Sequence, residues 1–167
     1  MDAASAKLDL LKVVELFARY NVEYLVIGGQ AAILHGSPKL TFDTDLCYRR
    51  TADNLERLAR ALAEIHPTLR GAPPDLPFIL DARSLALGSN FTFNTDLGPL
   101  DLLGWVEPLG GYDDLIGRAE TYDLETARVA VIGLDDLIAV KKHIRRPKDQ
   151  AALTELEALK RLRDETK

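Results

Sequence analysis

The chain reads LVIGGQAAILHGSPKLTFDTDL over residues 25–46, and this stretch decides the fold. Its last part predicts a strand over 40–48 that carries Asp43 and Asp45 one residue apart. Successive side chains of a strand alternate between its two faces, so the two carboxylates are expected on the same face, with their α-carbons roughly 7 Å apart. The pair therefore predicts a site where two acidic groups converge.

A third aspartate, Asp101, stands in another strand-like run, predicted over 99–106. An adjacent strand would bring its carboxylate to the same place, where three like charges repel one another unless a cation neutralises them. Hard oxygen ligands suit Mg²⁺ or Mn²⁺, and two such ions stabilise both oxygens of an in-line phosphoryl displacement. The alternative is that Asp-x-Asp is simply common near turns and strand ends.

The double glycine Gly28-Gly29 falls where a strand predicted over 23–28 gives way to a helix predicted over 30–35. Glycines at such a junction let the backbone approach a phosphate closely, and the helix N-terminus offers free N–H groups and partial positive charge. The competing interpretation is an ordinary glycine turn between a strand and a helix.

These residues resemble the nucleotidyltransferase superfamily that shares its catalytic core with DNA polymerase β. Its signature is a strand, Gly-Gly or Gly-Ser, a short spacer, Asp-x-Asp and a later third carboxylate, and Gly28-Gly29, Asp43, Asp45 and Asp101 match it in order and spacing. The resemblance implies an α/β (α+β) fold, namely a minimal nucleotidyltransferase fold with a mixed central sheet flanked by helices and followed by C-terminal helices.

More narrowly, residues 28–46 look like the branch that holds the abortive-infection type IV toxins and many uncharacterised bacterial nucleotidyltransferases. That branch usually carries an Arg and a Thr just ahead of the aspartates. Thr41 matches, while Lys39 replaces the Arg, which keeps the charge and loses a bidentate fork. The resemblance implies that both positions bind the nucleotide.

The resemblance returns at residues 134–149, where a helical lysine and an Asp after a basic turn are associated with nucleotide binding. These roles fall on Lys141 and Asp149; a second Asp found three residues further on in the branch is replaced by Ala152. The basic cluster around Lys141 is either a solvated helix end or a contact for a triphosphate or an RNA backbone. Its members are Lys142, Arg145, Arg146 and Lys148, of which Lys148 is predicted to bind the nucleotide.

Helical spacing places Lys141 in line with an apolar stripe, where its ammonium needs a partner or an exit to water. One interpretation makes it a nucleotide ligand. The other is that its methylene stem packs while the charged head reaches solvent.

Length and composition set the remaining limits. At 167 residues, 47% of them hydrophobic, the chain is expected to form one domain over 1–167, with a core at about 22–132 and C-terminal helices over 134–164. The single Cys47 forms no internal disulfide and no apolar run reaches membrane-spanning length, which favours the reducing cytoplasm and no membrane partner. The net charge of −5 argues against a general nucleic-acid coat protein.

The other helices and strands follow from apolar periodicity and breakers. Phe91–Phe93 is expected to pair with Leu100–Leu103 as a hairpin, and Asn21 to end the first helix. Helices are predicted over 6–20, 52–65, 112–119, 134–145 and 148–164, and strands near 77–81 and over 85–94, 120–124 and 127–132, with a Pro-rich turn after residue 65.

Other chemistries have weaker support. His35 is interpreted either as a residue that touches the substrate or as a structural residue at a helix end, and Cys47 as a packing residue. The histidines have no companions at zinc spacing.

The predicted activity is transfer of a nucleoside monophosphate from an NTP to an acceptor hydroxyl, with release of pyrophosphate. Asp43 and Asp45 would hold two Mg²⁺ or Mn²⁺ ions, and Asp101 would bind the catalytic ion and accept the hydroxyl proton. Gly28-Gly29 would cradle the phosphates while Lys141 neutralises the leaving charge.

Resemblance leaves the acceptor open. It implies the 3′ end of tRNA, a partner protein's side chain or a small hydroxylated drug, and it favours a toxin–antitoxin setting with a cognate partner. The alternative function is a non-catalytic module that binds a nucleotide or a partner on the same fold.

Overall fold

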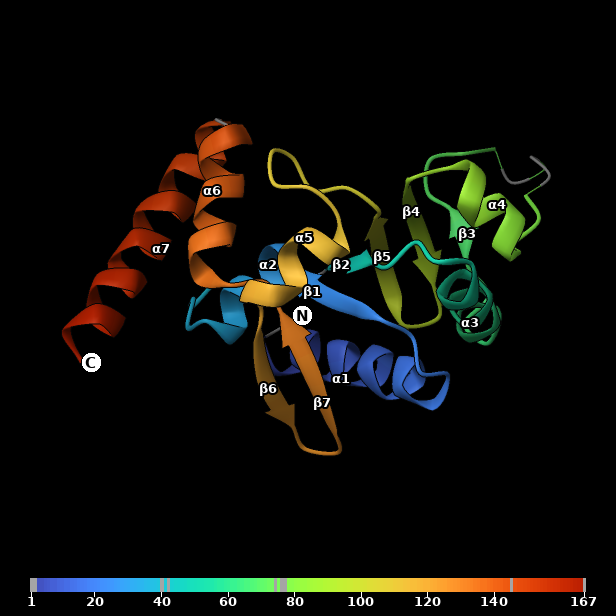
Figure 1. Cartoon of the computed structure of the whole chain (residues 1–167), viewed down its shortest axis with the longest axis horizontal. Coiled ribbons are helices and arrows are strands. Elements are labelled where there is room, and N and C mark those ends of the chain that lie inside the picture. Colours follow the sequence, from blue (N-terminus) through green and yellow to red (C-terminus); the bar gives the residue numbers. More distant parts are fainter. Residues whose placement is uncertain are drawn as a thin grey trace.

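A computed structural model describes residues 3–39, 41, 43–73, 75, 78–144 and 146–166, without the side chains of residues 3–9 and 148. Its centre is a seven-stranded sheet in the order β3-β4-β5-β2-β1-β7-β6 (Figure 1). The strands are β1 (Tyr24–Ile27), β2 (Thr44–Tyr48), β3 (Thr68–Leu69), β4 (Asn90–Thr95), β5 (Gly98–Leu103), β6 (Glu120–Leu124) and β7 (Ala127–Val131).

The sheet is mixed. β2 pairs antiparallel with β1 and parallel with β5, β7 pairs parallel with β1, and the outer neighbours pair antiparallel. In this register Ile27 lies opposite Asp45, and Asp45 lies opposite Asp101. The end of β1, the start of β2 and the middle of β5 therefore meet at one place, which confirms the predicted fold class.

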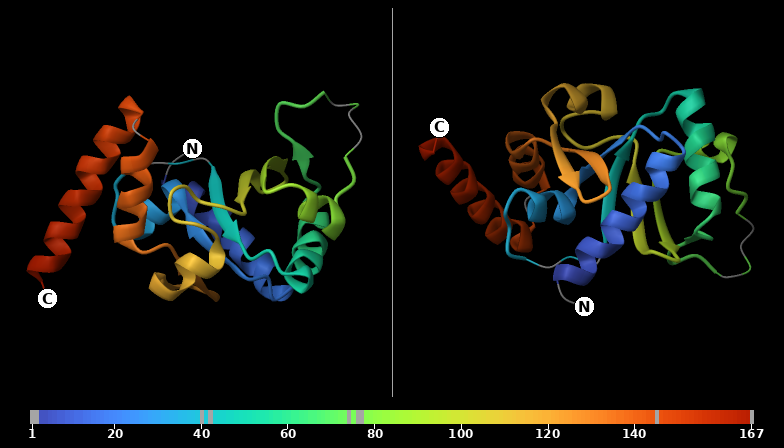
Figure 2. Two further views of the ribbon diagram at one scale, coloured as in Figure 1. Left: turned by 45° about the horizontal axis from the view of Figure 1, so that its top comes forward. Right: turned by 90° about the horizontal axis from the view of Figure 1, so that it is seen from below.

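The helices cover the sheet and its two ends. α1 runs across one face, while α6 and α7 stand side by side at the end opposite α3 and α4 (Figure 2). The helices are α1 (Ala3–Arg19), α2 (Gly28–Leu34), α3 (Ala52–Ala63), α4 (Ala82–Leu87), α5 (Tyr112–Leu115), the 3₁₀ turn η1 (Ile116–Arg118), α6 (Leu134–Ile144) and α7 (Pro147–Glu165).

One continuous core follows from the apolar periodicity of these elements. α1 contributes Val13, Val14 and Phe17, which are buried against the apolar faces of the central strands, and Leu58 of α3 extends the same core. Asn21 ends the α1 segment with φ +55°, as predicted for a residue that follows a helix.

The unit from β1 to β2 differs from the prediction at two boundaries. The helix begins at Gly28 rather than residue 30, and the strand begins at Thr44 rather than residue 40. Asp43 lies one residue ahead of β2 rather than within it, and it lines the same pocket as Asp45, as the predicted convergence of the two carboxylates requires. Residues 40 and 42 lie outside the described residues.

The segment between α3 and β4 was predicted least well. Residues 78–80 form no strand, and the start of the strand predicted over 85–94 is instead helical, because Asp81 caps α4 by accepting a hydrogen bond from the Ser84 amide at 2.7 Å. β3 lies within the predicted Pro-rich turn. The hairpin was correct: β4 and β5 pair with Phe91 opposite Leu102.

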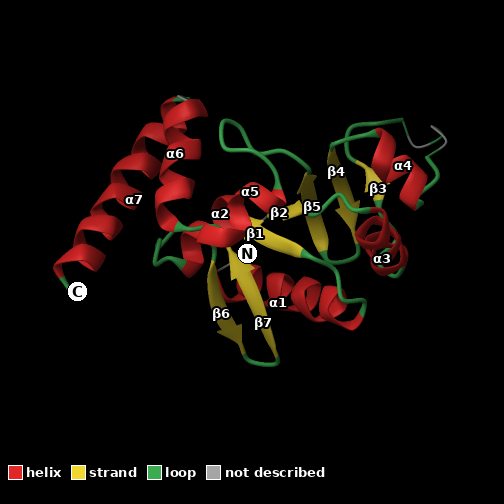
Figure 3. Ribbon diagram, viewed as in Figure 1, coloured by secondary structure: helices red, strands yellow, loops and turns green. Residues whose placement is uncertain are grey.

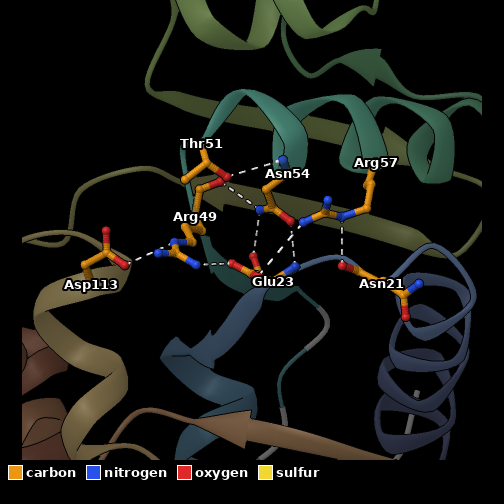
Figure 4. Close-up of polar contacts among 7 residues, drawn as sticks. All are labelled: Asn21, Glu23, Arg49, Thr51, Asn54, Arg57 and Asp113. Atoms are coloured by element: carbon orange, nitrogen blue, oxygen red, sulfur yellow. Dashed lines mark hydrogen bonds and ion pairs between the residues drawn. The ribbon is translucent and has the colours of Figure 1, made fainter.

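A polar network fixes the far ends of β1 and β2 (Figure 4). Asn54 of α3 accepts a hydrogen bond from the Glu23 amide at 2.7 Å, and its side-chain amide donates to the carbonyls of Glu23 and Arg49. Arg49 also pairs with the carboxylates of Glu23 and Asp113. Buried Asn54 thus satisfies both strand ends and stabilises the β1–β2 register, in which Ile27 lies opposite Asp45.

Candidate active site

Asp45 and Asp101 occupy neighbouring positions on parallel strands β2 and β5. Asp43 lies just ahead of β2, and all three aspartates line one pocket of about 500 Å³. The pocket also receives Gly28, Gly29, Lys39, Thr41, Lys141 and Asp149, so the structure gathers every predicted site residue except Lys148, whose side chain is not described.

The charge balance at the carboxylates is unusual. Burial, followed by the neighbouring Asp101 carboxylate and then Asp43, raises the pKa of Asp45 to about 7, while Lys141 opposes the shift. The Asp45 carboxyl therefore keeps its proton up to near neutral pH. A bound cation would replace that proton.

The donor set fits a hard divalent cation. Asp101 Oδ1 is buried and accepts no hydrogen bond of good geometry from the described residues, although the Arg70 guanidinium lies beside it. No three histidine, cysteine or acidic side chains in the described part of the chain are close enough to enclose an ion by themselves. Mg²⁺ is typically held by one or two carboxylates together with substrate phosphates and water, which is the set that Asp45 and Asp101 provide.

Arg70, which the sequence analysis missed, reaches this site from the turn after β3. Its Nη2 lies 2.9 Å from Asp101 Oδ1, an ion pair that lacks hydrogen-bond geometry. The same guanidinium donates to the Phe93 carbonyl at 2.7 Å and to Asn94 Oδ1 at 3.3 Å. These two hydrogen bonds to β4 therefore hold the Arg70 guanidinium beside the carboxylate of Asp101.

Gly28 and Gly29 let the side chains of Asp45 and Thr41 pack closely against the backbone at the start of α2. Gly28 has φ +66°, and a Cβ there would lie 2.2 Å from Asp45 Oδ2. A Cβ on Gly29 would lie 2.9 Å from the Thr41 hydroxyl. α2 begins at Gly28, and its N-cap residue Ile27 makes no side-chain hydrogen bond to the first turn.

Lys141 finds its partner on the neighbouring helix. Its Nζ lies 3.1 Å from Asp149 Oδ1, and Arg146 Nε lies 2.7 Å from Asp149 Oδ2. Burial alone would raise the pKa of Asp149, but the hydrogen bonds from Arg146 and Lys141 hold it below its ordinary value. Both carboxylate oxygens of Asp149 are thus bound, so Asp149 orients the side chains of Lys141 and Arg146 at the pocket.

The remaining pocket residues are more open. Lys39 is half exposed and its Nζ lies 3.9 Å from Glu155, while the Thr41 hydroxyl donates to the Asp43 carbonyl at 3.4 Å. Ser37, not predicted as a ligand, also lines the pocket, and its hydroxyl accepts from the Lys39 amide at 3.2 Å.

His35 is structural. Its Nε2 lies 2.7 Å from the Ile132 carbonyl, and its Nδ1 lies close to Tyr122, Arg163 and Glu120. The imidazole is buried among these partners and is absent from the pocket lining, so the substrate-contact interpretation was wrong. Burial raises the pKa of the Cys47 thiol to about 12, in keeping with a packing role.

Comparison with known proteins supports the fold. No family model and no curated protein sequence matches the chain. Among solved structures, the lincomycin-bound lincosamide antibiotic adenylyltransferase LnuA is similar with a TM-score of 0.59 and 15% identity, over 90% of this chain and 96% of that one. TM1012 from Thermotoga maritima, a candidate nucleotidyltransferase, is similar with a TM-score of 0.58 and 13% identity, over 99% of this chain and 96% of that one.

These neighbours establish that the chain has the fold of the nucleotidyltransferases. At sequence identities this low, the similarity supports a shared fold and nothing beyond it. Among the residues that the structure describes, none of the helices is both long and apolar enough to cross a membrane.

Proposed function

We propose that this protein is a Mg²⁺-dependent nucleotidyltransferase, which moves a nucleoside monophosphate from an NTP to an acceptor hydroxyl and releases pyrophosphate. The observation that carries the proposal is the register of Asp45 opposite Asp101, above a pocket that also holds the Gly28-Gly29 backbone and Lys141. Carboxylates, close backbone amides and a lysine are the groups that phosphoryl transfer uses for positioning and charge stabilisation.

The residues divide the work by their chemistry. Gly28 and Gly29 line the pocket at the start of α2, where their backbone would meet the β- and γ-phosphates, and Lys39, Thr41 and Ser37 line the same pocket. Lys141, oriented by Asp149, faces the negative charge that develops on the leaving pyrophosphate.

Asp45, Asp101 and the adjacent Asp43 are the residues that would hold Mg²⁺ or Mn²⁺. The bound ions would neutralise the α-phosphate and the attacking and leaving oxygens. Asp101 lies on β5, the strand next to β2, and is the carboxylate that would take the proton of the acceptor hydroxyl.

The biological setting is a further part of the proposal. Resemblance of residues 28–46 to type IV toxins supports a toxin–antitoxin role with tRNA or a partner protein as acceptor. The structural likeness to LnuA, an antibiotic adenylyltransferase, supports a small-molecule acceptor. The competing function is a nucleotide- or partner-binding module that has kept the fold without turnover.

Label transfer tests the proposal. Purified protein receives Mg²⁺ and each α-labelled NTP in turn, with total RNA, cell protein or water as the acceptor, beside Asp43→Ala and Asp101→Asn. Pyrophosphate release and labelled product that both variants lose would support the transferase. Nucleotide binding without pyrophosphate release in any pool, with Mg²⁺ and Mn²⁺ both tried, would support the binding module instead.

A further inference from the structure

A second, smaller cavity of about 250 Å³ adjoins the pocket at the carboxylates. The two cavities share Gly28, Asp45, Asp101, Lys141 and Arg146. The rest of the smaller cavity is apolar, and its walls come from the ends of β1 and β5, the loop after β5, the residue after β7 and one face of α6. These walls are Ile27, Leu103, Val106, Ile132, Leu137, Val140 and Ile144.

The loop after β5 lies beside α6 (Figure 3), and Val106 of that loop and Val140 of α6 both line the smaller cavity. It therefore meets the carboxylates from the side of α6 and β5. The larger pocket instead meets them from α2 and α7, through Gly29, Ala152 and Leu156.

Size and chemistry separate the two compartments. The larger pocket, at about 500 Å³, lies within the range of roughly 300–1,000 Å³ that encloses a drug-sized ligand, whereas the smaller cavity lies below it. The larger pocket also contains the glycines, Lys39 and Thr41, which suit a triphosphate. The nucleotide therefore belongs in the larger pocket.

In-line displacement places the attacking oxygen opposite the leaving pyrophosphate. With the pyrophosphate against Gly28-Gly29, an acceptor approaches the carboxylates from the cavity that the triphosphate does not fill. The charged side chains of this cavity, Asp45, Asp101, Lys141 and Arg146, all lie at the boundary that it shares with the larger pocket. Beyond that boundary the seven apolar walls leave the hydroxyls of a sugar or the phosphates of RNA without partners, which disfavours those acceptors.

From this arrangement we infer that the apolar cavity is the acceptor site, and that its substrate is a small neutral alcohol or phenol with a compact apolar body. The inference rests on the proposed nucleotidyl transfer. The apolar body packs against Val106, Leu137 and Val140, and its hydroxyl points to Asp101 at the shared boundary.

The step balances without a further reactant. The acceptor oxygen forms a bond to the α-phosphorus, and the bond from that phosphorus to the oxygen bridging to the β-phosphate breaks. Pyrophosphate leaves with that bonding pair beside Lys141, and the hydroxyl proton passes to the Asp101 carboxylate and on to water. The products are an NMP ester of the alcohol and pyrophosphate.

The test uses 4-fluorobenzyl alcohol as the probe, with glycerol and a short RNA bearing a free 3′ hydroxyl as the other acceptors. Pyrophosphate release with water alone measures the basal reaction. Fluorine NMR then follows both binding of the probe, as line broadening, and formation of its NMP ester. The expected result is ester formation with the fluorinated alcohol well above that with glycerol or RNA.

Val140→Phe fills the cavity from its half-buried rim, and His143→Phe adds the same ring to an exposed position on the same helix. Val140→Phe is expected to lower ester formation and probe binding by roughly tenfold. Affinity for the NTP should stay unchanged in both variants, and His143→Phe should also keep the wild-type ester formation, with circular dichroism confirming the fold of each.

If Val140→Phe does not fold, Leu103→Met makes a smaller change in the same wall and is expected to alter the probe line width without altering NTP affinity. The inference is overturned if the RNA end is labelled while the probe is not, or if Val140→Phe weakens the NTP rather than the probe, which would assign the cavity to the nucleobase. Absence of pyrophosphate release with every NTP would overturn the proposed function itself, and this inference with it.

Discussion

The guanidinium of Arg70 lies 2.9 Å from the carboxylate of Asp101, although Arg70 follows an outer strand of the sheet and Asp101 lies on β5 near its centre. Two hydrogen bonds to β4, at the Phe93 carbonyl and the Asn94 side chain, hold the arginine there. Asp101 therefore has a cation on one side and Asp45 on the other. This arrangement orients the third carboxylate before any substrate is bound.

Arg70→Ala is expected to lower kcat by about 10- to 100-fold, because loss of a group that orients a ligand-binding carboxylate typically has that effect. The KM for the NTP should change less, since Arg70 is not in the lining of the phosphate pocket. Arg70→Lys should recover part of kcat, as it keeps the charge and loses the fork. Steady-state kinetics at several Mg²⁺ concentrations measure kcat and the KM for the NTP separately.

The matched control for Arg70 is Arg128→Ala, which removes an exposed ion pair with Asp123 on the β6–β7 hairpin. Exposed pairs of this kind contribute little, so its kinetics should equal those of the wild type. An Arg70→Ala enzyme with normal kcat, or one in which Lys is no better than Ala, would contradict the positioning role.

Gly28→Ala is expected to reduce both stability and activity. The new Cβ would lie 2.2 Å from Asp45 Oδ2, and φ +66° disfavours a side chain, so the free energy of unfolding should fall by roughly 1–3 kcal/mol. Urea unfolding followed by the fluorescence of Trp105, the one tryptophan of the sequence, measures the change.

Gly117→Ala provides the comparison, because a Cβ at that position meets nothing within 4 Å. It should leave stability and turnover nearly unchanged. Equal effects of the two substitutions would show that the Gly28 contact with Asp45 has no special role.

The stability of the metal-free protein should depend on pH through Asp45. Its pKa rises from 3.8 in the unfolded chain to about 7 in the fold, so the native state binds more protons between those values. The stability that this group contributes is therefore fully present below about pH 3.8 and is lost progressively as the pH rises from there through about 7. Mg²⁺ binds the deprotonated form, so the rise in Tm that it produces should grow across the same window.

Thermal melts with and without Mg²⁺, at about pH 5.5 and about pH 8.5, check this dependence. Asp45→Asn removes the titrating group and should be more stable than the wild type at the higher pH, on the order of 1 kcal/mol, and respond less to Mg²⁺. An equal Mg²⁺ shift at both pH values in the wild type would contradict the assignment.

The sequence predicted the structure best where apolar residues recur at a regular spacing and a glycine marks the boundary of the element. β1, the glycine junction and β6–β7–α6–α7 were predicted within a few residues, because long apolar stripes and glycine breakers specify them locally. The carboxylates Asp45 and Asp101 were predicted to meet, and the parallel pairing of β2 with β5 brings them into register.

The misses have a common physical cause, which is dependence on tertiary contacts. α4 replaces a predicted strand because of one capping bond from Asp81 and the burial of Leu85. Arg70 reaches Asp101 through the β3–β4–β5 register, and no spacing in the sequence reports that pairing. The apolar cavity likewise combines residues from five separate segments.

Asp149 provides a last prediction, because it is buried with both oxygens bound by Lys141 and Arg146. Asp149→Asn removes the charge that holds these cations together, so the KM for the NTP should rise by roughly tenfold while pyrophosphate release at saturating NTP falls less. Asp135→Asn, which breaks an exposed pair with Lys160, is the control. A direct ligand role for Asp149 would instead abolish nucleotide binding in calorimetry, and tighter binding after the substitution would contradict both roles.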